Sequence, residues 1–218
     1  MKHFCLFCLS AALLMAMDPS WTSKPVSQWN PDDARQVLGD SPWSKAVRPA
    51  LLPQLNESQL REGGQMGGAR RMAKWPGVAG AKRGKDAPKL GAVLVRWESA
   101  LTVRTAHLKA GDANAPEWDG DYYVIAVSDV PGADYNGLAG ELKSLAFLKR
   151  NGKKDLRPSR VDVVSLGSTV LRVVYLFSRS QEITPEDQHI EFVAQIGPLY
   201  VSEVFNTQDM QLQGKLEL

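Results

Sequence analysis

The pair Trp97-Glu98 is the part of the sequence that comes nearest to catalytic chemistry. A carboxyl group packed against an aromatic ring can have a raised pKa and act as a general acid. Glycoside hydrolysis needs two carboxylates, however, and the sequence pairs no second one with Glu98. The pattern GAVLVRW, residues 91–97, predicts a strand with Val93 and Val95 on one face. We therefore expect Trp97 to be a core residue and Glu98 to be a surface charge at the end of this strand.

Residues that could bind a metal ion are few. Glu117, Asp119 and Asp121 surround a glycine in PEWDGD, but this run lacks the further oxygen ligands of a calcium loop. A solvated turn is the expected structure there. His107 and His189 are not spaced as a zinc-binding pair. We expect His107 to lie on a helix surface and His189 to point outward from a strand. We expect no metal site.

A long basic stretch, residues 61–89, separates two parts of the chain. It contains seven glycines and no apolar periodicity, so it cannot bury enough surface to fold and is predicted to be a disordered linker. Its eight basic and two acidic residues give it a charge of +6, whereas the whole chain carries +2. The segment GAKRGKD within it, residues 80–86, has one residue too few between its glycines for a phosphate loop. We expect no cofactor.

A second basic group, which we call the basic cluster, lies at the end of a predicted helix and in the loop after it. It could bind an anionic polymer through its charge, although it contains no aromatic residue to stack on a base. A helix end followed by a solvated loop explains the same residues. The basic cluster consists of Lys149, Arg150, Lys153, Lys154, Arg157 and Arg160.

The first seventeen residues, MKHFCLFCLSAALLMAM, have the layout of a cleavable secretory signal. Lys2 precedes an apolar run that is shorter than the roughly 20 residues a membrane-spanning helix needs. Both cysteines, Cys5 and Cys8, lie within this segment, so the mature chain would hold no disulfide. The alternative is an N-terminal core helix. We expect an exported protein, either periplasmic or extracellular.

Residues 18–60 form an N-terminal segment with one short helix that is well marked at both ends. Asn30 is a suitable N-cap, Pro31 suits the first helical position, and Gly39 suits the position after the end. A helix of two turns is not stable alone in water. Trp29 and Trp43 flank it, so we expect these residues to anchor the helix on the larger domain or to bind a partner.

The remaining residues, 90–218, have the pattern of one α+β domain. Residues 98–109 suit a helix and a strand equally, and residues 189–196 alternate in the way of an antiparallel strand with one buried face. The expected fold is an antiparallel sheet with one or two packed helices, preceded by the short N-terminal helix, docked or free, and the disordered linker. The alternative is a β-sandwich with a helical insertion. A helix is predicted at residues 138–150, and strands at 91–97, 122–128, 160–166, 169–178, 189–196 and 199–205.

Several stretches resemble a group of uncharacterised exported bacterial proteins. They are SKPVSQWNPDDARQVLGDSPW, RWESAL, YYVIAVSDVP and GPLYVSEVFNTQDMQLQGKLEL, and they span the predicted mature chain except the linker. The resemblance implies export and a shared fold. It implies no activity, because a shared fold does not by itself carry a function.

These patterns favour an exported, non-catalytic binding or interaction module. Its partner would be a protein of the cell envelope or an anionic polymer. One alternative is a cell-envelope hydrolase with a site built from dispersed residues, Glu98, Asp119, Asp121 and His189. The other is a polyanion-binding module that uses the linker and the basic cluster.

Overall fold

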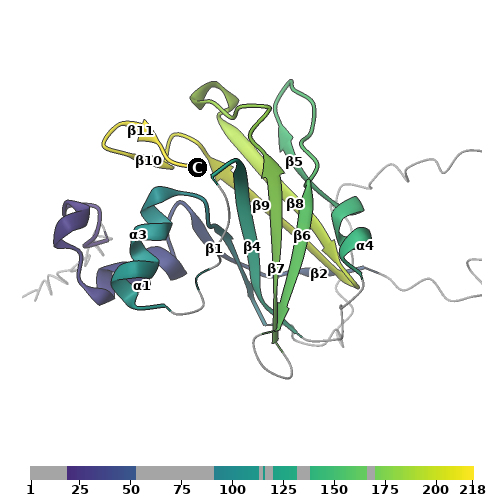
Figure 1. The fold of residues 1–218 in the computed structure, drawn as a ribbon, viewed down its shortest axis with the longest axis horizontal. Coiled ribbons are helices and arrows are strands. Elements are labelled where there is room, and N and C mark those ends of the chain that lie inside the picture. The colour runs from purple at the N-terminus through teal and green to yellow at the C-terminus, as the bar shows by residue number, and fades with distance from the viewer. Residues whose placement is uncertain (1–18, 53–90, 113–114, 116–119, 132–137, 166–169) are drawn as a thin grey trace, which may run out of the picture.

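The computed structural model describes residues 19–52, 91–112, 115, 120–131, 138–165 and 170–218 (Figure 1). The predicted signal segment (1–17) and the predicted linker (61–89) lie outside the described residues, as do Glu117 and Asp119. The proposals of a secretory signal, a disordered linker and a solvated acidic turn therefore stay predictions.

Sheet A has five antiparallel strands in the order β1-β3-β4-β7-β6. Strand β4 continues beyond its predicted end at residue 128 to Pro131. A register shift between Val127 and Val130, with Asp129 at φ 59°, keeps the strand paired with β7. The strands are Ser44–Val47 (β1), Val93–Trp97 (β3), Tyr122–Pro131 (β4), Val170–Ser178 (β7) and Arg160–Ser165 (β6).

Sheet B has four antiparallel strands in the order β2-β9-β8-β5. The alternation predicted for residues 189–196 is confirmed, because Ile190, Phe192, Ala194 and Ile196 are buried whereas His189 is exposed. A hairpin of Gln211–Leu212 (β10) and Lys215–Leu216 (β11) follows sheet B. The strands of sheet B are Ala50–Leu51 (β2), Leu199–Asn206 (β9), His189–Ile196 (β8) and Ala146–Arg150 (β5).

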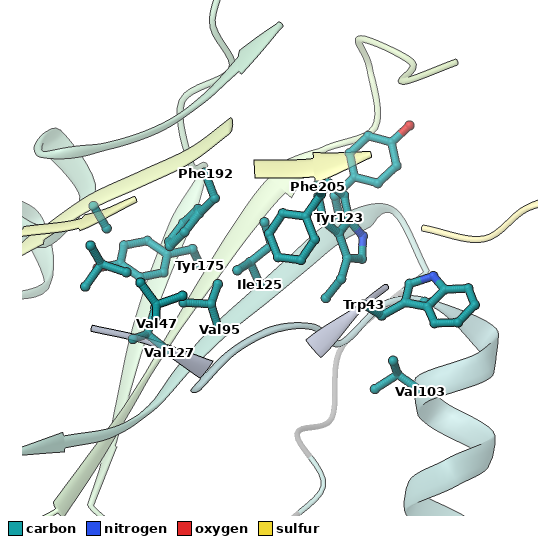
Figure 2. Packing of buried hydrophobic residues seen from close by; sticks show 14 of the residues in the cluster. Trp43, Val47, Val95, Val103, Tyr123, Ile125, Val127, Tyr175, Phe192 and Phe205 are labelled. Atoms are coloured by element: carbon teal, nitrogen blue, oxygen red, sulfur yellow. The ribbon is translucent and has the colours of Figure 1, made fainter. Parts of the chain in front are cut away.

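The two sheets pack face to face, and their inner faces form the core (Figures 1 and 2). Tyr175 of β7 packs edge-on against Phe192 of β8, with ring centroids 5.4 Å apart. Trp97 of β3 makes a similar contact with Phe205 of β9 at 5.5 Å. Such aromatic contacts between strands of different sheets add to the hydrophobic burial. The fold is α+β, as predicted, and its sheets are antiparallel.

Helices lie beside the sheets. Helices α1 and α3 pack on each other at one end of the sheets, and α4 lies at the other end (Figure 1). Helix α3 resolves the ambiguity of residues 98–109 in favour of a helix. No helix in the described ranges is long and apolar enough to cross a membrane. The α-helices are Pro31–Gly39 (α1), Leu101–Ala110 (α3) and Ala139–Ser144 (α4), and the 3-10 turns are Val26–Gln28 (η1) and Pro185–Asp187 (η2).

The prediction of one helix over residues 138–150 is wrong after Ser144. The chain leaves α4 and becomes β5, in which Ala146, Phe147 and Leu148 are buried and pair with β8. The apolar stripe had helical spacing, but pairing with a strand more than forty residues away determines the structure of this segment. Leu138, a member of the predicted stripe, is 38% exposed.

The N-terminal segment is an integral part of this fold. Asn30 caps α1 as predicted, since its side chain accepts hydrogen bonds from the N–H groups of Asp32 and Asp33. Beyond the helix, the chain adds β1 to sheet A and then β2 to sheet B. Residues 44–51 thus join both sheets, so the predicted N-terminal segment contributes strands to the sheets of the predicted domain.

Trp29 and Trp43 hold this segment on the domain. They are 5% and 0% exposed, and Trp21 lies 6.0 Å from each of their ring centroids. The indole N–H of Trp43 donates to the carbonyl of Glu217. These rings are core anchors, and a partner could not reach them without opening the core.

Candidate functional site

One region of charged side chains in the described chain is buried except for Asp112 at its margin. We call it the buried network: Arg96, Glu98, His107 and Asp112. The Nε of Arg96 donates a hydrogen bond to Oε1 of Glu98 at 2.8 Å. The distance from Nε2 of His107 to Oε2 of the same carboxylate is also 2.8 Å. The other ring nitrogen of His107 lies 2.9 Å from Oδ2 of Asp112. Glu98 is 0% exposed, so its two oxygens meet only protein.

The partners of Glu98 stabilise its ionised form. Burial raises the pKa of Glu98, but the hydrogen bond from His107 and the charge and hydrogen bonds of Arg96 lower it by more, and the carboxyl group is held ionised. The two ring nitrogens of His107 lie beside carboxylate oxygens of Glu98 and Asp112. The buried carboxylate of Glu98 thus has close partners on both of its oxygens.

The buried network ties three elements together. Arg96 is at the end of β3, His107 is on α3, and Nη1 of Arg96 donates to the carbonyl of Leu38 in the last turn of α1. The helix pair is thereby fixed to sheet A by charge-assisted hydrogen bonds. Both oxygens of Glu98 are bonded to side chains of these elements, which indicates a structural role for the buried network.

Two expectations from the sequence are corrected here. Glu98 is neither a surface charge nor a general acid with a raised pKa, because it is buried and its pKa is lowered. His107 is not on a helix surface, since it is 3% exposed. The dispersed hydrolase site is not assembled in the described part of the chain either: Asp121 and His189 are exposed, and Glu98 is bonded to Arg96 and His107 instead.

The second region is a pocket of about 520 Å³ between β1 and β9. We call it the seam pocket, because it lies between β1 of sheet A and the part of β9 in sheet B that extends beyond β2. Trp21 and Pro42 contribute apolar wall, and Val204 of β9 contributes an exposed edge. The polar side chains that line it are Gln36, Asp40, Lys45, Glu203, Asn206 and Asp209.

Glu203 is the unusual residue of the seam pocket. It occupies an inward position of β9, in register with the buried side chains of Val201 and Phe205, where an apolar residue is the rule. Burial raises the pKa of Glu203, and the charge of Lys45 and the N–H of Val204 offset only part of this effect. A carboxyl group with a raised pKa in a pocket is a candidate functional residue.

The carboxylates of the seam pocket are not paired as those of the buried network are. Asp40, Glu203 and Asp209 form no ion pair within the described ranges, and Lys45 is the one basic residue among the described residues on the wall. Three acids facing one lysine leave the seam pocket negatively charged. Such a site attracts positive groups.

A third buried carboxylate positions one wall of this pocket. Asp33, 2% exposed, accepts hydrogen bonds from the Ser20 hydroxyl and from Nζ of Lys24, at 2.9 Å for the closer oxygen. These hydrogen bonds, together with that from the backbone of Asn30, lower the pKa of Asp33 to about 2. The segment around Trp21 is thereby held on α1.

The basic cluster is largely engaged in internal contacts. Lys149 pairs with Glu191 at 2.9 Å, Lys153 with Asp187 at 2.8 Å, and Arg160 with Asp162 at 2.9 Å. Each of these cations has a carboxylate partner in the protein, so an incoming phosphate or carboxylate would compete with it.

Two other members of the basic cluster, Arg150 and Arg157, donate hydrogen bonds to backbone carbonyl groups. Arg150 is buried and donates to the carbonyl of Lys154, whose own side chain is exposed. Arg157 donates to the carbonyl of Ser144 and lies 5.0 Å from the ring centre of Phe147. These contacts fix the β5–β6 connection, and the side chains of Lys154 and Arg157 remain exposed, so binding of an anionic polymer by the basic cluster stays a prediction.

Comparisons of the chain with protein-family models, curated proteins and solved structures found no match. Function must therefore be inferred from the geometry of the sites. The resemblance to exported bacterial proteins stays a prediction.

Sequence patterns assign no candidate role to Asp40, Lys45, Glu203 or Asp209, which line the seam pocket. A signal for one of them was present. In LYVSEVFN the residues Leu199, Val201, Glu203 and Phe205 share one face, and a charge on an otherwise apolar face is a recognisable exception. The other three residues come together only through the fold.

Proposed function

We propose that this protein is a non-catalytic binding module whose seam pocket takes a positively charged group. The observation that carries the proposal is the set of unpaired carboxylates, Asp40, Glu203 and Asp209, around a pocket of ligand size. Asp40 and Asp209 are exposed, whereas Glu203 is partly buried, and a partly buried charge that lacks a close partner lowers the stability of a fold. A ligand cation would restore the missing partner.

The walls indicate the kind of cation. Carboxylates at the mouth and amides from Gln36 and Asn206 suit a group with several N–H donors. A guanidinium fulfils this best, because its planar fork can form two parallel hydrogen bonds with one carboxylate. The adjacent apolar wall, which includes Trp21 and Pro42, suits the alkyl stem of such a group.

The wall also favours binding over catalysis. No histidine lies among the described residues that line the seam pocket, and the hydroxyl of its Ser41 donates to the carbonyl of Val37. Nucleophilic catalysis by serine needs a base within hydrogen-bond reach, which this serine lacks.

The proposal is tested by titration calorimetry with agmatine, a small guanidinium compound, and with glutarate as the anionic control. We expect saturable binding of agmatine that weakens about tenfold or more in Glu203→Gln, which corresponds to the loss of one charge-assisted hydrogen bond. Glu141→Gln, on the exposed surface of α4, is the matched control and should leave the affinity unchanged. Equal binding to all three proteins, or no binding to the unaltered protein, would overturn the proposal.

We also propose that the protein acts outside the cytoplasm. The layout of its first seventeen residues supports this proposal. Intact-mass measurement of the protein from its native host tests it. Loss of the first segment is expected, and a full-length cytoplasmic species would contradict export.

A further inference from the structure

We infer that the open edge of β9 accepts an extended basic peptide of a partner protein as an added strand, with a cationic side chain of that peptide against Glu203. This inference rests on the proposed function, because it uses the same seam pocket and names the ligand as a peptide. It adds that the ligand's main chain, as well as its charge, is recognised.

The open edge begins where β2 ends. Strand β2 pairs only with Leu199 and Tyr200 at the start of β9. From residue 201 to residue 206, β9 pairs on one side with β8, and no described strand pairs with its other side. The seam pocket borders this stretch, since Glu203, Val204 and Asn206 line it.

The hydrogen-bond pattern shows which backbone groups face the open edge. Thr207 donates its N–H to the carbonyl of Gln188, and Leu52 donates to Pro198 on the opposite side. In an antiparallel ladder this alternation directs Val201, Glu203 and Phe205 to β8, and Ser202 and Val204 away from it. The N–H of Val204 accordingly lies by the carboxylate of Glu203 and contributes to lowering its pKa, against the larger effect of burial.

An unpaired edge of this kind pairs with an extended chain unless something prevents it. The inward charge of Glu203 prevents an apolar strand from adding, because such a strand would enclose the carboxylate without a partner. A strand with a lysine or arginine beside Glu203 would supply that partner. The same residue therefore excludes unsuitable strands and selects basic ones.

The chemistry of the surroundings agrees with this choice of partner. Asp40 and Asp209 extend the negative charge beyond Glu203, so more than one cation of the peptide would be attracted. Val204 is 52% exposed on the outer face of sheet B, where an apolar side chain of the added strand would cover it. Main-chain hydrogen bonds would supply affinity and the alternating side chains would supply specificity.

The test compares three heptapeptides by titration calorimetry and by amide hydrogen exchange. The first alternates threonine and valine around a central arginine, the second has glutamate in place of arginine, and the third keeps arginine but is N-methylated at alternate amides. We expect the first to bind and to protect the amides of Ser202 and Val204 from exchange. The glutamate peptide should not bind. The N-methylated peptide should bind about tenfold or more weakly, because it cannot complete the ladder.

The variant Ser202→Pro removes one N–H from the open edge without removing a backbone bond to β8, and Ser202 does not line the seam pocket. We expect it to lose affinity for the arginine peptide while it still binds agmatine, and retained agmatine binding also shows that the variant is folded. Glu203→Gln should lower the affinity for both the arginine peptide and agmatine.

The outcomes are distinguishable. If agmatine binds but the arginine and N-methylated peptides bind equally, strand addition is wrong and the cation pocket stands. If neither agmatine nor any peptide binds, both proposals are wrong. If the Ser202 amide is already protected in the free protein, the edge is covered by this chain and strand addition is wrong. Equal binding of the arginine and glutamate peptides would overturn the role of Glu203.

Discussion

Glu98 and Glu203 are both glutamates that the fold draws away from water, yet their surroundings shift their pKa values in opposite directions. Glu98 is completely buried and meets Arg96 and His107, so its pKa is lowered. Glu203 is only partly buried and has Lys45 as its one basic neighbour on the described pocket wall, and its pKa is raised. The deeper carboxylate is thus the better compensated one. Burial alone does not identify a functional charge, and the presence or absence of partners does.

The largest effect should come from removing the centre of the buried network. Glu98→Gln leaves the buried guanidinium of Arg96 without its carboxylate partner, and the loss of one partner of a buried pair costs about 3–5 kcal/mol. We expect the free energy of unfolding in urea, followed by circular dichroism, to fall by about this amount. Glu203→Gln, the same chemical change in the seam pocket, should change it by less than about 0.5 kcal/mol. Similar losses in the two variants would remove the distinction between the two regions.

The second effect concerns Asp33, a well-paired carboxylate on the pocket side of the molecule. Its pKa is lowered to about 2 by hydrogen bonds from Ser20 and Lys24, from an ordinary value of 3.8. A carboxyl group with a lower pKa in the folded state than in the unfolded state stabilises the fold at pH values above its pKa in the unfolded state. This stabilisation is lost as the pH falls through its pKa in the folded state. The difference in unfolding free energy between the protein and Asp33→Asn should therefore be complete above about pH 4 and should decrease between about pH 4 and 2. A difference that does not depend on pH in this range would contradict the assignment.

Glu203 should show the opposite dependence, with a smaller amplitude. Its pKa is raised in the folded state, so its ionisation opposes folding once the pH exceeds the folded value. Glu203→Gln should be slightly more stable than the unaltered protein at pH 7, and the difference should vanish below about pH 4.5, where the carboxyl group is protonated in both states. Urea unfolding at several pH values measures it. A variant that is less stable at pH 7 would show that Glu203 is a compensated charge after all.

The sequence was sufficient for the elements whose burial is one-sided and whose signals are local. The alternation in residues 189–196 and the capping signals of Asn30 and Pro31 are properties of neighbouring residues, and the structure confirms both. The local pattern of residues 146–150 predicts a helix, but these residues form strand β5. Their composition suits a helix, and the pairing with β8 that makes them a strand depends on residues far away in the chain.

The candidate sites were harder to predict for the same reason. Glu98 and His107 were assigned to the surface because no acid or base pairs with them at a regular helical or strand spacing in the sequence. Their contact forms because α3 folds back on the end of β3. The seam pocket requires residues from both ends of the chain, Asp40 and Lys45 on one side and Glu203 and Asp209 on the other. Only the misplaced polarity of Glu203 could be detected locally.

The central claim is that the unpaired carboxylates of the seam pocket bind cations whereas the paired carboxylates of the buried network do not. Mapping of amide chemical shifts by NMR during a titration with agmatine tests it most directly. We predict saturable shifts at Asp40, Lys45, Glu203, Val204 and Asp209, with no change at Glu98 and His107. Shifts centred on the buried network, or weak shifts spread over all acidic residues without saturation, would contradict the account.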